Sequence, residues 1–319
     1  MIRSVKVEAL ESGKTAELVL ANPEGSLGFA ITGIDGLGPG TATLNDSEWV
    51  TVDGSHENSV RLPARVITIN LRFVTTELYE SVADVRRRTY DYFPIKKKVR
   101  LTFEFADFRV MQTVRHRWIE GTVKQNDTGP FSEEEGAVIQ VHCSDPYFKD
   151  TEIVEEKLSQ IREVFHFDFP DEYMSENCEL FNMPPISEET DTTNFIVSEY
   201  MQLRERDITN PSALDVGGIF KLEAFGNVKN PAIYNATTRE VFELDYNMSA
   251  GEVITIDTRQ GHKKVYINDG YETSLLQYLH TNSKWLHLGA GLNTIGYDAT
   301  LGAENLFLSF TMTPIYEGV

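Results

Sequence analysis

The stretch ITINLRF, at Ile67–Phe73, decides how the first half of this chain is expected to fold. Apolar and polar residues alternate strictly along it, which is the period of a strand with one buried and one exposed face. The stretch VRLTFEF, at Val99–Phe105, repeats the pattern. Two such strands predict a sheet with one hydrophobic face, and the short connections around them suit antiparallel neighbours.

One helix is predicted between these two strands. Leu78, Val82 and Val85 are spaced so that they share one apolar helix face. Arg86–Arg88 fall in its expected last turn, where positive charge suits the helix dipole. Pro94 prevents the helix from continuing.

The rest of the chain predicts short strands separated by turns rich in Gly, Asn and Asp. A segment at Glu152–Val164 is the exception, where we expect a short helix. Many short strands of this kind predict a mainly β protein, with a sandwich or jelly roll in the second half. The expected strands are Arg109–Lys124, Ala137–Cys143, Val253–Ile256, Lys264–Ile267, Lys284–Leu288 and Leu306–Met312.

The length of 319 residues is enough for two domains. We expect one at residues 1–150 and another at 151–319, with an acidic linker and surface excursion over about 151–192. Residues 65–124 hold 13 Lys and Arg against 7 Asp and Glu, a net of +6, whereas residues 152–199 hold 2 against 13, a net of -11. Both stretches are either solvated faces or complementary surfaces of neighbouring subunits. Such surfaces build a ring only if they lie far apart on one subunit.

Composition excludes several kinds of protein. A net charge of -20 argues against tight nucleic-acid binding, and two Cys exclude a disulfide scaffold or a four-Cys zinc site. No secretion signal or membrane span is predicted, so we expect the chain to be made in a cytoplasm and to stay soluble. The glycines of Gly36–Gly40 precede no helix, so a phosphate loop is not expected there. We expect no catalytic residue, cofactor or metal, and no motif supports an enzyme.

A series of segments runs in order along nearly the whole chain and resembles one known family. These segments are Ile31–Gly40, Asp53–Ser55, Arg61–Arg65, Tyr92–Val99, Ile119–Gly121, Phe131–Ala137, Cys143–Phe148, Asn230–Asn235, Ile256–Thr258 and Gly289–Asn293. They are similar to the siphophage distal tail protein, often labelled phage tail family protein. The motifs are specific in the first half and looser in the second, and residues 171–192 do not align.

The resemblance implies an architecture and a role. The N-terminal domain would be a β-sandwich with a helix and a hairpin that closes into a hexameric belt, and the C-terminal domain a galectin-like β-sandwich outside the ring. The protein would be assembled in the bacterial cytoplasm and sit at the tail tip of the virion. There it would join the tail tube to the tail-associated hub and to receptor-binding or baseplate proteins. DNA would pass through the ring without being specifically bound, and no membrane would be involved.

Two sets of residues are candidates for a functional site. Trp285 is a candidate for stacking a sugar if the second domain acts as a lectin for host cell-wall glycans, although core packing is the interpretation we favour. A cell-wall hydrolase is a further alternative, without a supporting motif. The candidates for contacts between subunits form the one basic cluster with aromatic neighbours, namely Arg86, Arg87, Arg88, Lys96, Lys97 and Lys98.

Overall fold

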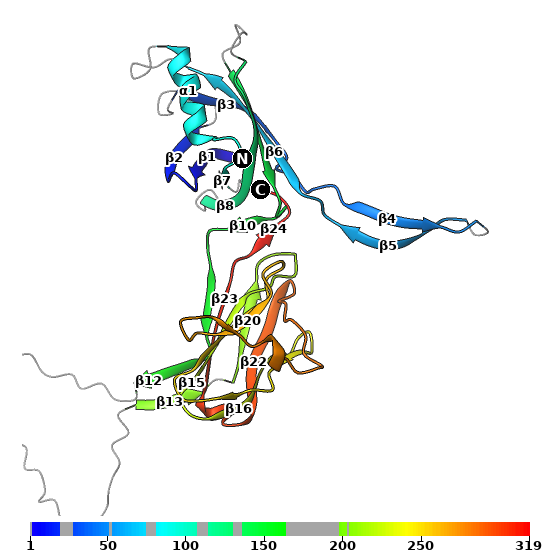
Figure 1. Cartoon of the computed structure of the whole chain (residues 1–319), viewed down its shortest axis with the longest axis vertical. Coiled ribbons are helices and arrows are strands. Elements are labelled where there is room, and N and C mark those ends of the chain that lie inside the picture. The colour runs from blue at the N-terminus through cyan, green and yellow to red at the C-terminus, as the bar shows by residue number, and fades with distance from the viewer. Residues whose placement is uncertain are drawn as a thin grey trace, which may run out of the picture.

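The structure of the chain, a computed structural model, consists of two stacked units built from antiparallel strands (Figure 1). Within the described residues α1 (Val82–Tyr92) is the one α-helix, so the predicted mainly β class is confirmed. No helix among these residues is both long and apolar enough to cross a bilayer. The described residues are 2–19, 28–50, 53–74, 81–106, 114–129, 136–163, 198–202 and 204–319.

The first unit, here called the N-terminal unit, is one curled sheet with α1 packed against it. Its strands run in the order β2-β1-β7-β8-β9-β6-β3, and β2 and β3, at the two ends of this order, are in contact. Two short strands, β10 and β24, are added beside β8. The strands are β1 (Ile2–Ala9), β2 (Lys14–Val19), β3 (Phe29–Asp35), β6 (Arg65–Phe73), β7 (Lys98–Ala106), β8 (Val114–Asp127), β9 (Gly136–Cys143), β10 (Phe148–Asp150) and β24 (Ile315–Tyr316).

The core of the N-terminal unit lies inside this curled sheet. In β6 the side chains of Ile67, Ile69, Leu71 and Phe73 are buried, and the residues between them are partly or fully exposed. This alternation is the pattern that the sequence predicts, and β7 follows it with Val99, Leu101 and Phe103. Alternate burial on neighbouring strands therefore gives one continuous hydrophobic cluster.

Helix α1 begins later than the apolar spacing predicts. Ser81 is its N-cap, because the Ser81 hydroxyl oxygen accepts a hydrogen bond from the Asp84 backbone N–H. The helix then runs to Tyr92 and stops before Pro94, as expected. Arg86–Arg88 therefore lie in the middle of the helix, so their predicted place in the last turn is wrong. Leu78 lies outside the described residues.

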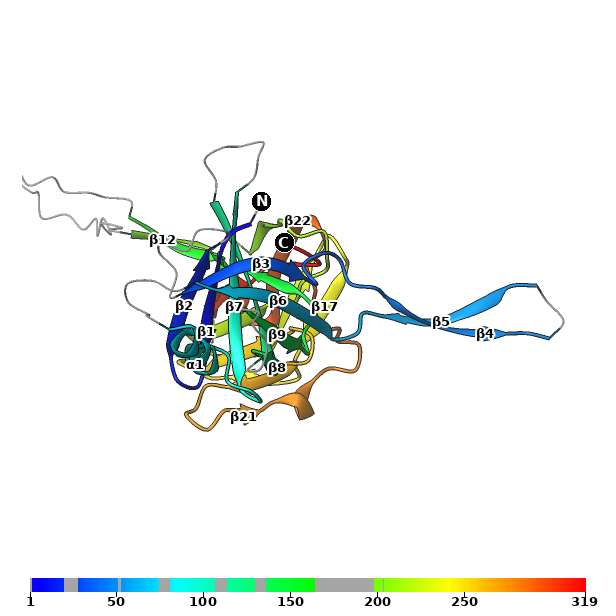
Figure 2. The same ribbon diagram turned by 90° about the horizontal axis from the view of Figure 1, so that it is seen from above.

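A long hairpin leaves the body of the N-terminal unit. It consists of β4 (Thr43–Glu48) and β5 (Ser55–Arg61), which pair antiparallel from Thr43–Arg61 to Glu48–Ser55. Figures 1 and 2, two perpendicular views, both show it projecting on the side opposite α1. We call these two strands and the described residues between them the arm.

The second unit, here called the C-terminal unit, is a sandwich of two sheets facing each other across a second hydrophobic core. One sheet has the order β11-β23-β15-β19-β20-β21, and the other β14-β22-β16-β17, with β18 beside β16. The strands are β11 (Val154–Lys157), β14 (Glu205–Asn210), β15 (Ile219–Ala224), β16 (Val228–Asn235), β17 (Glu240–Glu243), β18 (Asn247–Met248), β19 (Val253–Asp257), β20 (Lys264–Ile267), β21 (Thr273–Ser274), β22 (Gly291–Leu301) and β23 (Leu306–Met312).

Short elements complete this half of the chain. β12 (Ser159–Glu163) and β13 (Ser198–Gln202) form a separate antiparallel pair. Two 3-10 helices cover Leu276–Tyr278 and Ala303–Asn305. The strand predicted at Lys264–Ile267 is confirmed as β20, which pairs with β21 across a turn.

Two predictions in this half are wrong. Glu152–Val164 is not a helix, because the described part of it forms β11 and β12; its last residue lies outside the described residues. Lys284–Leu288 is not a regular strand: only Leu288 makes an isolated β-bridge, with Val216. Leu286 and Leu288 are buried, so the alternation of burial is real, but the segment pairs with no neighbouring strand along its length.

The chain returns to the N-terminal unit at its last residues. β24 pairs with β10, so the two connections between the units run side by side (Figure 1). Arg117 donates a hydrogen bond from Nη1 to the Gly318 carbonyl at 2.6 Å, and its guanidinium lies 3.6 Å from the centre of the Tyr316 ring. Each unit has its own hydrophobic core, and the division into two domains at residue 150 stays a prediction.

Candidate interface surfaces

The arm buries almost nothing within its own subunit. All seven residues of β5 are exposed, and in β4 only Ser47 is partly covered. Leu44 and Val60 face each other across the two strands with 57% and 51% of their surfaces exposed. An isolated two-stranded hairpin is at best marginally stable in water, and apolar side chains displayed on it indicate a contact surface.

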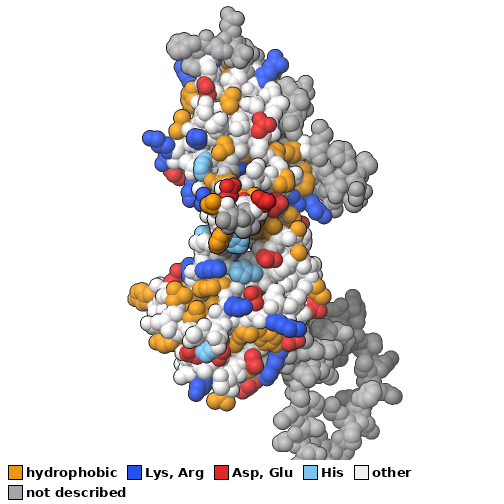
Figure 3. Space-filling model, turned by 90° about the vertical axis from the view of Figure 1, so that its right-hand side faces the viewer, with side chains coloured by type: hydrophobic (Ala, Val, Ile, Leu, Met, Phe, Trp, Pro, Cys, Tyr) orange, Lys and Arg blue, Asp and Glu red, His pale blue; other side chains and the backbone are white. Residues whose placement is uncertain are grey.

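The end of the arm combines apolar and acidic side chains. Trp49 is 67% exposed and Val50 fully exposed. Figure 3 faces the side toward which the arm projects, and acidic and hydrophobic side chains gather together there. Residues 43–58 hold four acids, Asp46, Glu48, Asp53 and Glu57, and no Lys or Arg, so their net charge is -4.

The root of the arm is fixed by a buried arginine. Arg65 donates from Nη1 to the carbonyls of Gly36 and Gly38, at 2.9 and 2.6 Å, and from Nη2 to the Glu317 carbonyl at 2.5 Å. Its guanidinium also lies 4.7 Å from the centre of the Phe148 ring. Burial lowers the pKa of Arg65 below its usual value. One side chain thus ties the glycine loop, the sheet and the chain's last residues together.

The glycine loop at Gly36–Gly40 serves this attachment. Gly36 has a φ of +88°, and a Cβ there would stand 2.4 Å from the Val66 carbonyl oxygen, so a side chain does not fit. Two carbonyl oxygens of the loop are turned toward Arg65, whereas a phosphate loop presents backbone N–H groups. The geometry is that of a structural loop.

The three arginines of α1 do not form one patch. Successive residues of a helix point about 100° apart, so the triplet spreads around the helix. Arg87 points outward, with 79% of its side chain exposed and an Asp84 carboxylate 3.9 Å away. Arg86 and Arg88 are partly buried. Of the triplet, Arg87 is therefore the residue best placed to meet another molecule.

The three lysines occupy the tight turn that leads from α1 into β7. Lys96 takes a left-handed backbone with φ of +67°, and its N–H donates to the Val123 carbonyl at 3.0 Å. The Val123 N–H donates in turn to the Lys97 carbonyl at 3.0 Å. Lys98 is the first residue of β7. These two hydrogen bonds attach the turn to β8, and all three lysine side chains are exposed.

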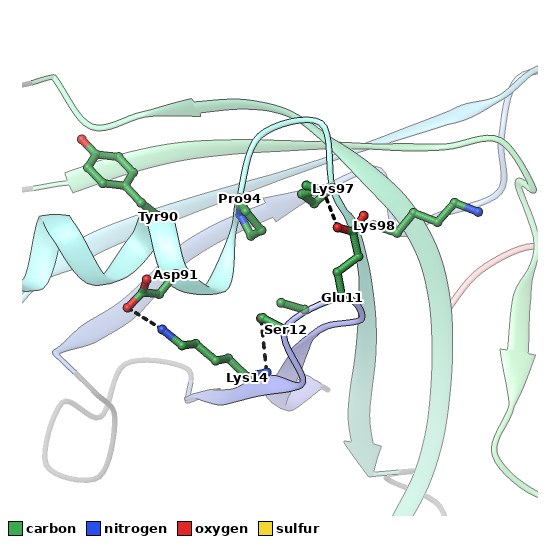
Figure 4. Close-up of a pocket in the computed structure, with 9 residues that line it drawn as sticks. Glu11, Ser12, Lys14, Tyr90, Asp91, Pro94, Lys97 and Lys98 are labelled. Atoms are coloured by element: carbon green, nitrogen blue, oxygen red, sulfur yellow. Dashed lines mark hydrogen bonds and ion pairs between the residues drawn. The ribbon is translucent and has the colours of Figure 1, made fainter.

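A hollow of about 360 Å³ lies between the end of α1, this turn and the turn joining β1 to β2. Two ion pairs stand on either side of Pro94 (Figure 4): Lys14 with Asp91, at 3.0 Å, and Lys97 with Glu11. In the same view Lys98 points outward at the margin. The lining residues are Ala9, Glu11, Ser12, Lys14, Tyr90, Asp91, Pro94, Lys97 and Lys98.

Trp285 is placed by packing within the C-terminal unit. It is partly buried against the core, and its ring centre lies 5.2 Å from that of Phe242. Lys263 Nζ lies 5.9 Å from the Trp285 ring centre. This is the core-packing arrangement that the sequence favours, and sugar stacking by Trp285 stays a prediction.

The arm is the candidate surface that sequence reasoning did not locate. Its strands have no face toward a core, so alternation of apolar and polar residues is missing. The one local signal is Asp53-Gly54, a turn-forming pair in which Gly54 has a φ of +101°.

Comparison with known proteins shows which family and which solved structures this chain is similar to. Residues 213–313 match the family described as "Siphovirus-type tail component, C-terminal domain". Among solved structures, the Dit protein of phage SPP1 is similar over 98% of this chain and 99% of that chain, at 10% identity and a TM-score of 0.58. A chain of the phage P2 baseplate in its activated conformation with Ca aligns over the full length of both chains, at 11% identity and a TM-score of 0.45. No curated protein matches the sequence.

The family match and the fold agree, because residues 213–313 are similar to a siphovirus-type tail component and the SPP1 Dit protein has a similar fold. The match falls within the C-terminal unit, and the SPP1 likeness extends the same fold over both units. The resemblance in the sequence thus agrees with the family match over residues 213–313 and with the fold over both units.

Proposed function

We propose that the chain forms a hexameric ring at the tail tip that joins the tail tube to the tail-associated hub and to host-adhesion proteins. The observation that carries this proposal is the placement of the arm. It projects from one side of the N-terminal unit, and α1, the helix that carries Arg87, lies on the opposite side (Figures 1 and 2). Two different surfaces on opposite sides make a head-to-tail contact, which closes into a ring when its rotation allows.

Charge supports the same pairing. Residues 81–98 hold six Lys and Arg against two Asp, a net of +4, and residues 43–58 have a net of -4. Complementary charge of this kind favours the correct encounter and disfavours contact between two copies of the same surface. The number six comes from the distal tail protein resemblance.

The role at the tail tip rests on the family. The SPP1 Dit protein is described as a paradigm of the hub adsorption apparatus in phages that infect Gram-positive bacteria. We extend that role to this chain, with the N-terminal unit as the belt and the C-terminal unit on the outside, where it carries adhesion or baseplate proteins. With a net charge of -20, the ring lets DNA pass without gripping it.

The mass of the assembled chain tests the ring. Light scattering and negative-stain images of the purified protein, with and without its tail neighbours, should give a sixfold ring. Reversing the charge of Arg87, Lys97 and Lys98 together should weaken it at moderate salt, because these exposed charges contribute to the contact and salt screens them. A compact monomer at every concentration, even with the neighbours present, would contradict the proposal.

A further inference from the structure

We propose that the hollow beside Pro94 in one subunit receives the end of the arm of the neighbouring subunit, with Trp49 as its anchor. This inference rests on the ring proposed above and names the two surfaces that meet. The occupant is a second copy of this chain.

The end of the arm has the composition of an anchor. Trp49 exposes two thirds of its surface and stands beside fully exposed Val50. Tryptophan is among the residues that most often contribute a large share of the binding energy at an interface, usually by filling a pocket on the partner. Glu48 and Asp53 flank this apolar end in the sequence, so the anchor carries negative charge beside it.

The hollow has the complementary chemistry. Its lining includes the apolar side chains of Ala9 and Pro94, and the ammonium groups of Lys14 and Lys97 stand on either side of Pro94 (Figure 4). An aromatic ring inserted there packs on the proline and on the lysine stems, and its faces attract the ammonium groups. A hollow of about 360 Å³ has room for one indole side chain.

Two ion pairs place lysine side chains at the hollow. Asp91 and Glu11 each pair with one lysine, at 3.0 Å for Lys14 with Asp91, so both ammonium groups stand at the hollow in the free subunit. Lys98 points outward at the margin, on the side of the turn where Lys96 is also exposed. These two lysines are available to the acidic residues that flank Trp49.

A second hollow, on the C-terminal unit, fits the arm less well. It measures about 220 Å³ and includes one charged residue, Lys229, in a lining of seven. Its other lining residues are Asn227, Val228, Asn247, Met248, Ser249 and Leu301. Because Ser249 lines this hollow and Ser12 lines the first, the chain offers a matched pair of positions for a test.

Disulfide crosslinking tests the contact directly. In a Cys178→Ser background, which leaves the buried Cys143 and keeps Trp49, one variant carries Val50→Cys with Ser12→Cys and the control carries Val50→Cys with Ser249→Cys. On mild oxidation of the assembled protein, the first should give a ladder of covalent oligomers up to six chains, and the control should not. Trp49→Ala should also raise the concentration needed for assembly at least tenfold. Tyr271→Ala, which removes another exposed aromatic, should leave that concentration unchanged.

The outcomes separate this contact from the ring itself. A sixfold ring that gives no ladder with Ser12→Cys, or whose assembly is indifferent to Trp49→Ala, overturns the contact and leaves the ring standing. A ladder with Ser249→Cys alone assigns the arm to the second hollow and also overturns it. A protein that remains monomeric before any substitution, with its tail neighbours present, overturns both proposals.

Discussion

Two antiparallel strand pairs of the same subunit differ in what holds them together. β6 and β9 pair from Arg65–Cys143 to Arg72–Gly136, and every second residue of β6 is buried in the core. β4 and β5 pair over a similar length and bury almost no side chain. Hydrogen bonds between strands contribute little net stability in water, because the unfolded chain bonds to water instead. The first pair is thus stabilised by its own core, whereas the second has no core within the described residues of its own subunit.

Equal truncations in the two pairs should therefore have very different effects. Leu71→Ala, in β6, removes a side chain that is 4% exposed and should lower the free energy of unfolding by about 2–5 kcal/mol. Leu44→Ala, in the arm, removes one that is 57% exposed and should change it by less than about 0.5 kcal/mol. Chemical unfolding of the monomeric protein measures both. Similar losses in the two variants would show that the arm packs within its own subunit.

The stability of the protein should also depend on pH through Cys143, which pairs with Arg65 at one end of the β6–β9 ladder. Burial raises the pKa of the Cys143 thiol to about 12, from an ordinary value near 9. The folded state then holds this proton while the unfolded state loses it, so stability is fully present below about pH 8.5 and falls as the pH rises toward 12. The expected fall is at most about 1.4 kcal/mol per pH unit.

The difference between the chain and Cys143→Ala isolates this contribution. Other groups that titrate at high pH contribute equally to both proteins and cancel in the difference. Unfolding free energies should therefore fall more steeply above about pH 9 in the chain with Cys143 than in the variant. Parallel curves would show that the thiol titrates normally and that this end of the core pair is open to water.

The sequence predicts the elements that have a core face and misses those that do not. Ile67–Phe73 and Leu306–Met312 are found because alternate side chains are buried. The arm is missed because neither of its faces contacts a core, so its hydrophobic pattern has no period. Lys284–Leu288 gives a false strand for the opposite reason. Its alternation reflects real burial of Leu286 and Leu288, although its backbone pairs with a neighbour only at Leu288.

Prediction of the interface residues from the sequence has the same limit. The sequence singles out six basic residues, and the structure separates them. Lys97 and Lys98 line the hollow and Arg87 points outward, whereas Arg86 and Arg88 are partly buried. The sequence indicates an acidic surface at residues 152–199, most of which lie outside the described residues, and the arm carries a further acidic set at residues 43–58. Composition indicates complementary charge, and only the three-dimensional arrangement indicates which charges lie on opposite sides.

Mixing two defective subunits tests the head-to-tail contact most directly. One variant lacks the arm, with residues 43–61 replaced by a short Gly-Ser link. The other keeps the arm and carries Arg87→Glu, Lys97→Glu and Lys98→Glu. Neither should form a ring alone, and together they should form a one-to-one complex that grows no further, because one intact arm meets one intact basic surface. Rings formed by either variant alone, or a mixture that stays monomeric although the unaltered chain assembles, would contradict the account.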